Sequence, residues 1–264
     1  MTVGLAASMA RNRRSLTSMV WEPEVLHVDG PLGRIPATLF ISRDAIAGAP
    51  LILLGHGAHT SKDDPTMQVL ARALARGIGA GVVTLDCPGH GERRPAGLDE
   101  AEFDALVQAN MTDPAVFDQL ATEWPLVAAA ARARDQRLSG LTAYAGFSMG
   151  SIFGFGLVPR LPDLRVVLLA VGGLLDEHAA DPAAAERNTA RNHIIRDGAT
   201  RFGDRQVLMM NMTRDEHFPI AGALEVLALL PGPKRMVVWE GTHEQLPAEA
   251  MTMAIDFLRP HLTP

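Results

Sequence analysis

The sequence alternates between short, continuously apolar runs and longer segments whose apolar residues recur at helical spacing. The apolar runs occupy residues 51–54, 81–85, 141–145, 164–171, 206–211 and 235–239, and the helical segments lie near residues 67–78, 114–137, 149–157, 220–230 and 251–258. A run without polar alternation is typical of a strand buried on both faces, and strands that alternate with helices form parallel βαβ units. The pattern therefore predicts an α/β fold with a doubly wound, mostly parallel sheet.

Two segments interrupt this alternation, at about residues 92–112 and 174–204. Long insertions that follow the carboxyl ends of strands commonly build lids and substrate pockets. We therefore expect one domain over residues 23–264, with short cap insertions at these two places, preceded by an N-terminal arm or tail at residues 1–22. Neither insertion contains a recognisable motif.

Composition excludes several classes of partner. The chain has 24 basic and 30 acidic residues, for a net charge of −6, so it offers no general surface for nucleic acid. No apolar run approaches the ~20 residues that a membrane-spanning helix needs. The single cysteine, Cys87, cannot form an internal disulfide and fits a reducing compartment, so we expect a cytoplasmic protein.

The most specific motif is Gly-Phe-Ser-Met-Gly at residues 146–150, which lies between a predicted strand and a predicted helix. Two glycines permit a sharp strand-to-helix turn that exposes the hydroxyl of Ser148. The amino end of the following helix and the N–H of Met149 face the same point, where they would stabilise developing negative charge. This context predicts that Ser148 is a nucleophile.

A serine nucleophile needs a base and an acid that orients the base, and in this kind of fold both follow later strands. His243 comes directly after the last predicted strand and is the expected base. Asp215 follows the strand before it and is the expected acid. Glu216, its neighbour, and Asp176, which follows an earlier strand, are the alternatives for the acid.

A second glycine-containing turn, Gly55-His56-Gly57-Ala58, ends the first predicted buried strand. Its glycines allow the backbone to approach a ligand closely, and the N–H of Ala58 can pair with that of Met149 as an oxyanion hole. We expect Gly57 and His56 to lie at the substrate, with His56 bracing the loop by hydrogen bonding rather than acting as a base.

Together these pieces resemble the α/β-hydrolase family, in the family's order: the His-Gly loop, Asp86-x-Pro88-Gly89-His90-Gly91, the turn around Ser148, then Asp215 and His243. The chain is most similar to serine esterases of the dienelactone-hydrolase-like branch, in which a lysine follows the His-Gly loop, here Lys62. We expect Lys62 to be a solvated surface residue, with a contact to the loop as the alternative. Dienelactone hydrolases themselves carry cysteine where this chain has serine.

The residues and the resemblance together predict a carboxylic ester hydrolase. Ser148 would form an acyl-enzyme with a small-molecule ester or thioester, without a metal or organic cofactor. A cofactor-free perhydrolase or a carbon–carbon hydrolase or lyase on the same triad is the alternative, and a non-catalytic ligand-binding protein of this fold is a further one. Association into a homo-oligomer is left open.

Overall fold

The computed structural model describes residues 22–262, so the predicted arm or tail at 1–22 lies, except for its last residue, outside the described part. The strands are β1 (Glu24–Gly30), β2 (Gly33–Ile41), β3 (Leu51–Gly55), β4 (Gly81–Leu85), β5 (Thr142–Phe147), β6 (Leu164–Ala170), β7 (Gln206–Met212) and β8 (Lys234–Trp239). The helices are α2 (Pro65–Ile78), α3 (Glu100–Asn110), α4 (Pro114–Arg134), α5 (Met149–Leu157), α6 (Pro182–Thr200), α7 (Ile220–Leu229) and α8 (Ala248–Leu262), with short 3₁₀ turns at Gly91–Arg93 and Val158–Arg160.

In the described residues the strands form one eight-stranded sheet, in the order β1-β2-β4-β3-β5-β6-β7-β8. The pairs from β4 to β8 are parallel, and only β1–β2 and β2–β4 are antiparallel. The expected mostly parallel sheet is therefore confirmed. Gly55, at the end of β3, pairs with Gly146 near the end of β5, so the two glycine-containing turns of the sequence leave the sheet side by side.

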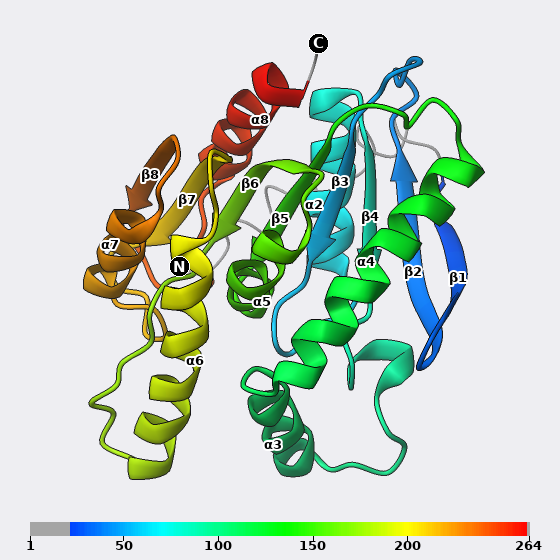
Figure 1. Ribbon diagram of the computed structural model, residues 1–264. Coiled ribbons are helices and arrows are strands. Elements are labelled where there is room, and N and C mark those ends of the chain that lie inside the picture. Colours follow the sequence, from blue (N-terminus) through cyan, green and yellow to red (C-terminus); the bar gives the residue numbers. More distant parts are fainter. Residues whose placement is uncertain (1–21, 263–264) are drawn as a thin grey trace.

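Helices cover both faces of the sheet (Figure 1). One face packs against α2 and α8, whose buried side chains form one apolar cluster with alternate strand residues. The opposite face carries a larger apolar cluster that includes side chains of α4, α5 and α7. This doubly wound arrangement follows from strands that are apolar on both faces. No helix within residues 22–262 is long and apolar enough to cross a membrane.

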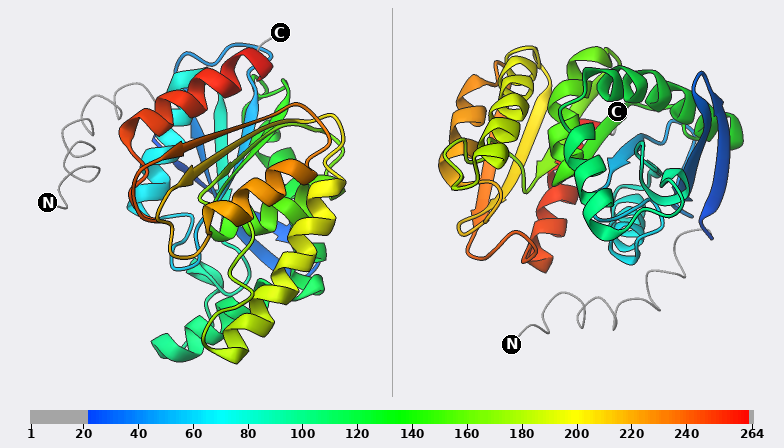
Figure 2. Two further views of the ribbon diagram at one scale, coloured as in Figure 1. Left: turned by 90° about the vertical axis from the view of Figure 1, so that its left-hand side faces the viewer. Right: turned by 90° about the horizontal axis from the view of Figure 1, so that it is seen from below.

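Each predicted insertion contains a helix. Helix α3 begins with a capping box, in which Asp99 accepts the N–H of Glu102 and Glu102 accepts that of Asp99. Helix α6 begins at an Asp181 cap followed by Pro182. Both helices extend beyond the carboxyl ends of the central strands (Figures 1 and 2).

The sequence pattern predicts a helix that continues to Arg137, but α4 ends at Arg134. Asp135 closes the helix in an extended conformation, and its carboxylate accepts hydrogen bonds from the backbone N–H and guanidinium of Arg137. The guanidinium of Arg137 also donates to the carbonyl of Ala45 at 2.9 Å. These bonds hold Arg137 in a turn outside the helix.

Candidate active site

Ser148 lies in the sharp turn between β5 and α5 and has a φ angle of 54°. This left-handed conformation is unusual for a residue other than glycine and costs of order 1–3 kcal/mol. Two glycines make the turn fit: a Cβ on Gly146 would lie 2.4 Å from the carbonyl oxygen of Gly150, and one on Gly150 would lie 2.5 Å from that of Gly55. The sequence prediction of a tight strand-to-helix turn is therefore confirmed.

Ser151 supports this turn, a role that sequence reasoning did not assign. Its buried hydroxyl lies 2.9 Å from the carbonyl oxygen of Gly146 and 2.8 Å from that of Ala170 on β6. The N–H of Ser148 donates to the same Ala170 carbonyl at 3.0 Å. The turn is thereby connected to the neighbouring strand, which limits the movement of Ser148.

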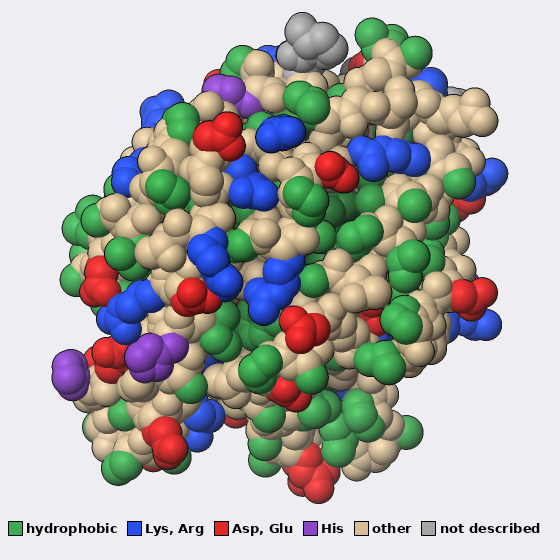
Figure 3. All heavy atoms as spheres, in the orientation of Figure 1, with side chains coloured by type: hydrophobic (Ala, Val, Ile, Leu, Met, Phe, Trp, Pro, Cys, Tyr) green, Lys and Arg blue, Asp and Glu red, His purple; other side chains and the backbone are tan. Residues whose placement is uncertain are grey.

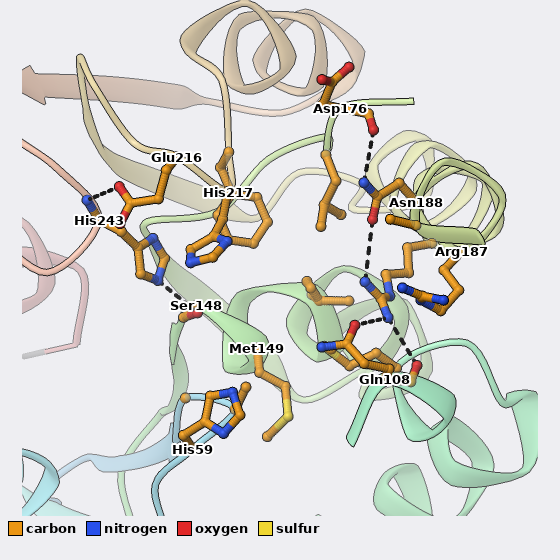
Figure 4. A pocket seen from close by; sticks show the side chains of 18 of the residues that line it. His59, Gln108, Ser148, Met149, Asp176, Arg187, Asn188, Glu216, His217 and His243 are labelled. Carbon is orange, nitrogen blue, oxygen red and sulfur yellow. Dashed lines mark hydrogen bonds between the residues drawn. The ribbon is translucent and has the colours of Figure 1, made fainter. Parts of the chain in front are cut away.

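The structure brings His243 and Asp215 to Ser148 as a chain of hydrogen bonds. The Nε2 atom of His243 lies 2.9 Å from Oγ of Ser148 (Figure 4). Its Nδ1 atom lies 2.8 Å from Oδ2 of Asp215. Because a carboxylate only accepts, Nδ1 carries the proton and Nε2 is free to accept the serine proton. The three side chains therefore have the geometry of a nucleophile, a base and an orienting acid.

The environment of Asp215 favours its ionised form. Its second oxygen, Oδ1, accepts the backbone N–H groups of His217 and Phe218, each at 2.9 Å. Burial disfavours the charged carboxylate, but the hydrogen bonds from His243 and the two backbone groups outweigh that effect and lower the pKa of Asp215. An ionised Asp215 can stabilise a positively charged His243.

The two alternative acids lie elsewhere. Oε2 of Glu216 accepts the backbone N–H of His243 at 3.1 Å, so Glu216 holds the loop and does not contact the imidazole Nδ1. The carboxylate of Asp176 accepts the backbone N–H of His178 and points away from His243 in Figure 4. Geometry thus favours Asp215 as the acid.

The loop after β3 presents the Gly57–Ala58 peptide to Ser148. The carbonyl oxygen of Gly57 accepts a hydrogen bond from Nδ1 of His56 at 2.8 Å and another from the hydroxyl of Thr60 at 3.0 Å. Because the described peptide bonds are all trans, the N–H of Ala58 points in the direction opposite to this carbonyl. Gly57 and Ala58 both line the cavity over Ser148. At the amino end of α5, the N–H of Met149 has no helical acceptor. The oxyanion hole at these two N–H groups stays a prediction.

His56 does not reach the cavity, which corrects the expectation that it contacts substrate. Its side chain is fully buried beneath the loop, with Nδ1 on the Gly57 carbonyl and Nε2 accepting the N–H of Cys87 at 3.0 Å. Burial, together with the nearby His90, lowers the pKa of His56 to about 3. The expected bracing role agrees with these contacts.

Lys62 is not a solvated surface residue, which is a second correction. Its side chain is only 1% exposed, and its ammonium forms ion pairs with Asp63 and Glu92. The backbone N–H of Lys62 donates to the buried carboxylate of Asp86 at 2.9 Å. Lys62 thus fastens the loop after β3 to the loop after β4.

A cavity of about 530 Å³ opens over Ser148, between the sheet and the two insertion helices. Its lining includes Ser148, Met149 and His243 on one side and Gln108, Arg187 and Arg191 on the other. The space-filling view shows a notch between the α3 and α6 parts of the surface (Figure 3). The two predicted insertions thus supply part of the pocket wall, as expected, but sequence reasoning did not identify Gln108, Arg187 and Arg191 as lining residues.

The described residues contain no cluster of three or more histidine, cysteine, aspartate or glutamate side chains arranged to hold a metal ion. The side chain of Cys87 is buried, and burial raises the pKa of its thiol. Ser148 and the histidines His59, His217 and His243 line the cavity.

Comparison with solved structures places this architecture among known proteins. A cold-adapted esterase from an Arctic intertidal metagenomic library superposes with a TM-score of 0.70 at 23% identity, over 91% of this chain and 93% of that one. A dienelactone hydrolase from Anabaena variabilis gives a TM-score of 0.63 at 17% identity, over 92% and 100% of the two chains. An α/β serine hydrolase without a lid from Xanthomonas campestris gives 0.61 at 18% identity, over 92% and 97%.

By sequence, no protein-family model matches the chain, and no curated protein matches it either. The similarity to solved structures nevertheless extends over nearly the whole of both chains. With the strand order and the turn at Ser148, it defines the class: this chain has the α/β-hydrolase fold, as its motifs predicted.

Proposed function

We propose that this protein is a carboxylic ester hydrolase that works through an acyl-enzyme on Ser148. One observation carries the proposal, namely the continuous hydrogen-bonded chain from Ser148 through His243 to Asp215 at the floor of a cavity. The similarity in fold to a protein described as an esterase supports it. The expectation of a cytoplasmic enzyme rests on the single cysteine and stays a prediction.

In the first half-reaction, Nε2 of His243 accepts the hydroxyl proton as Oγ of Ser148 attacks the ester carbonyl carbon. The carbonyl oxygen becomes an oxyanion and accepts the N–H groups of Ala58 and Met149. When the carbon–oxygen bond breaks, His243 returns its proton to the departing alcohol. Asp215 stabilises the imidazolium while the proton resides on it.

In the second half-reaction, water occupies the place of the alcohol. His243 takes a proton from the water, whose oxygen attacks the acyl carbon and forms a second oxyanion at the same two N–H groups. Collapse releases the carboxylic acid and returns the proton to Ser148. The protein supplies positioning and electrostatic stabilisation in both halves.

The test is reaction with a fluorophosphonate, followed by the intact mass of the protein. We expect one adduct on the wild type, located at Ser148, and none on Ser148→Ala. The exposed Ser139 provides a matched control, because Ser139→Ala also removes one serine hydroxyl, but far from the site. We expect the fluorophosphonate to label this variant as it labels the wild type. An unlabelled wild type, or an adduct that persists in Ser148→Ala, would contradict the proposal.

A further inference from the structure

The cavity over Ser148 has a second polar group of side chains, which the proposed mechanism does not use. Arg187 and Arg191 lie four residues apart on α6, so both project from one face of the helix into the cavity lining. Figure 4 shows Arg187 and Gln108 on the side of the cavity opposite Ser148 and His243.

Arg191 is buried and forms no ion pair with any residue in the described range 22–262. It is 3% exposed, and its guanidinium donates to the carbonyl and side-chain oxygens of Gln108 and, at 3.4 Å, to Oδ1 of Asn188. These acceptors are all uncharged, and its Nε–H has no acceptor among the described residues. Burial, and then the charge of Arg187, lower the pKa of Arg191 to about 10, so the group stays charged near neutral pH.

Arg187 adds a second cation beside it. The Nε–H of Arg187 also lacks an acceptor in the described part of the chain, and the ion-pair partner of this side chain is the exposed Asp181, at 3.8 Å. Two like charges four residues apart on a helix repel one another. A buried cation without a counter-charge is also costly. If Arg187 and Arg191 served only to link α6 to α3, neutral side chains would do so at a lower cost.

The acidic groups around the cavity have other partners or face other directions. Glu216 accepts the backbone N–H of His243 on the far side, and the Asp176 carboxylate points away from Arg187 (Figure 4). Glu244 belongs to the lining beside His243. The carboxylate of Asp104 on α3 attracts Arg191 only at longer range. Its Oδ1 atom lies 3.7 Å from Nε2 of His59 instead.

We propose that Arg187 and Arg191 bind a carboxylate carried by the substrate, so that the enzyme hydrolyses esters that bear a free carboxylate group. A guanidinium fork matches the planar carboxylate. The cavity lining also contains three acidic residues, which would repel a ligand with two negative charges more strongly than one with a single charge. This inference rests on the proposed ester hydrolysis at Ser148. It adds the substrate class, which no motif of the insertions indicates.

The kinetic test compares esters that differ only in charge. The para-nitrophenyl half-ester of adipic acid places a carboxylate at the end of the acyl chain, and the corresponding ester of adipamic acid replaces it with a neutral amide of the same shape. The pair para-acetoxybenzoate and para-acetoxybenzamide places the same difference on the alcohol side. We expect kcat/KM to favour the acid by about 10- to 100-fold within one of the two pairs.

Arg187→Gln should remove most of this preference, measured as the ratio of kcat/KM for the acid to kcat/KM for the neutral ester. Arg201→Gln, at the end of α6 and paired with Asp197, removes the same charge outside the cavity and should keep the preference. Arg191→Gln should act like Arg187→Gln, and circular dichroism checks that this buried substitution leaves the protein folded.

Equilibrium binding separates this inference from the proposed function. Calorimetry with adipate and with adipamide requires no turnover, so it tests the arginine pair even if no ester is hydrolysed and no fluorophosphonate adduct forms. We expect adipate to bind at least about tenfold more tightly than adipamide, and Arg187→Gln to abolish the difference. Equal binding of the two compounds, or an unchanged difference in Arg187→Gln, would overturn the proposal.

Discussion

The imidazole of His56 joins the carbonyl oxygen of Gly57 to the backbone N–H of Cys87, with Nδ1 donating at 2.8 Å and Nε2 accepting at 3.0 Å. Only the neutral ring with its proton on Nδ1 can make both bonds. Since the Gly57 carbonyl sets the plane of the next peptide, His56 determines where the N–H of Ala58 points. A buried side chain that substrate never contacts thus positions one donor of the proposed oxyanion hole.

Substitution of His56 should therefore lower kcat much more than it raises KM. In His56→Ala the Gly57 carbonyl loses its shortest hydrogen bond and the peptide can rotate, so we expect kcat to fall by about 10²–10³-fold, as when one oxyanion donor is removed. Steady-state kinetics on para-nitrophenyl acetate measure both constants.

Thr60→Val provides a graded comparison, because the hydroxyl of Thr60 is the second side-chain donor to the Gly57 carbonyl. With His56 intact, kcat should fall by only a few-fold. His56→Asn, whose side-chain amide can donate to the same carbonyl, should recover part of the activity lost in His56→Ala. A His56→Ala protein that stays folded and retains wild-type kcat would exclude the positioning role.

His56 also links stability to pH. Its pKa is about 3 in the folded protein and 6.5 when exposed, so between these values the unfolded state binds a proton that the folded state does not. Stability from this group is complete above pH 6.5 and decreases as the pH falls. From pH 6.5 to pH 5 we expect the free energy of unfolding to drop by about 1.5 kcal/mol through His56 alone.

Urea unfolding at several pH values measures this slope. The buried His90, whose pKa burial also lowers, adds to it in the same direction. Asp215 acts in a separate window, because its pKa lies below 3.8 and its contribution is lost only in stronger acid. His56→Asn should have a shallower slope than the wild type, whereas His178→Asn, at an exposed position, should keep the wild-type slope.

The assignment of the acid makes a distinct kinetic prediction. Asp215→Asn removes the charge that stabilises protonated His243 and favours the wrong imidazole tautomer, so kcat should fall by roughly 10³–10⁴-fold. Asp176→Asn should leave kcat within a few-fold, because its carboxylate contacts the backbone of His178 instead. The same esterase assay on both variants decides between them, and a large loss only in Asp176→Asn would refute the assignment.

The alternation of strands and helices and the places of Ser148, His243 and Asp215 directly after strands were predictable because local patterns determine them. A strand buried on both faces must be apolar throughout, and the turn that exposes Ser148 requires small residues where backbones meet. Each site residue follows a strand directly, and the carboxyl ends of parallel strands lie at one edge of the sheet. The separate positions in the sequence therefore converge in space.

The wall formed by α3 and α6 could not be predicted in the same way. Helix α6 buries Arg191 and Asn192 alongside Ile195, so its inner face lacks the apolar periodicity that indicates a helix. The burial of Lys62 depends on Glu92, which lies 30 positions further along the chain and 2.8 Å away in the fold. Such long-range polar contacts leave no periodic signal in a single sequence.

The contact between α5 and α6 leads to a last prediction, about Gly198. A Cβ at this position would lie 2.0 Å from the carbonyl oxygen of Phe155, which belongs to the helix that begins after Ser148. Gly198→Ala must therefore push α6 away from α5, and overpacking of this kind costs about 1–3 kcal/mol. Thr200→Ala, at an exposed position two residues further on, should change stability by less than about 0.5 kcal/mol.

Because α6 also carries Arg187 and Arg191, we expect Gly198→Ala to weaken adipate binding and to lower the free energy of unfolding. Calorimetry measures the first quantity and urea unfolding the second. An alanine variant as stable as the wild type would mean that the two helices do not pack this closely.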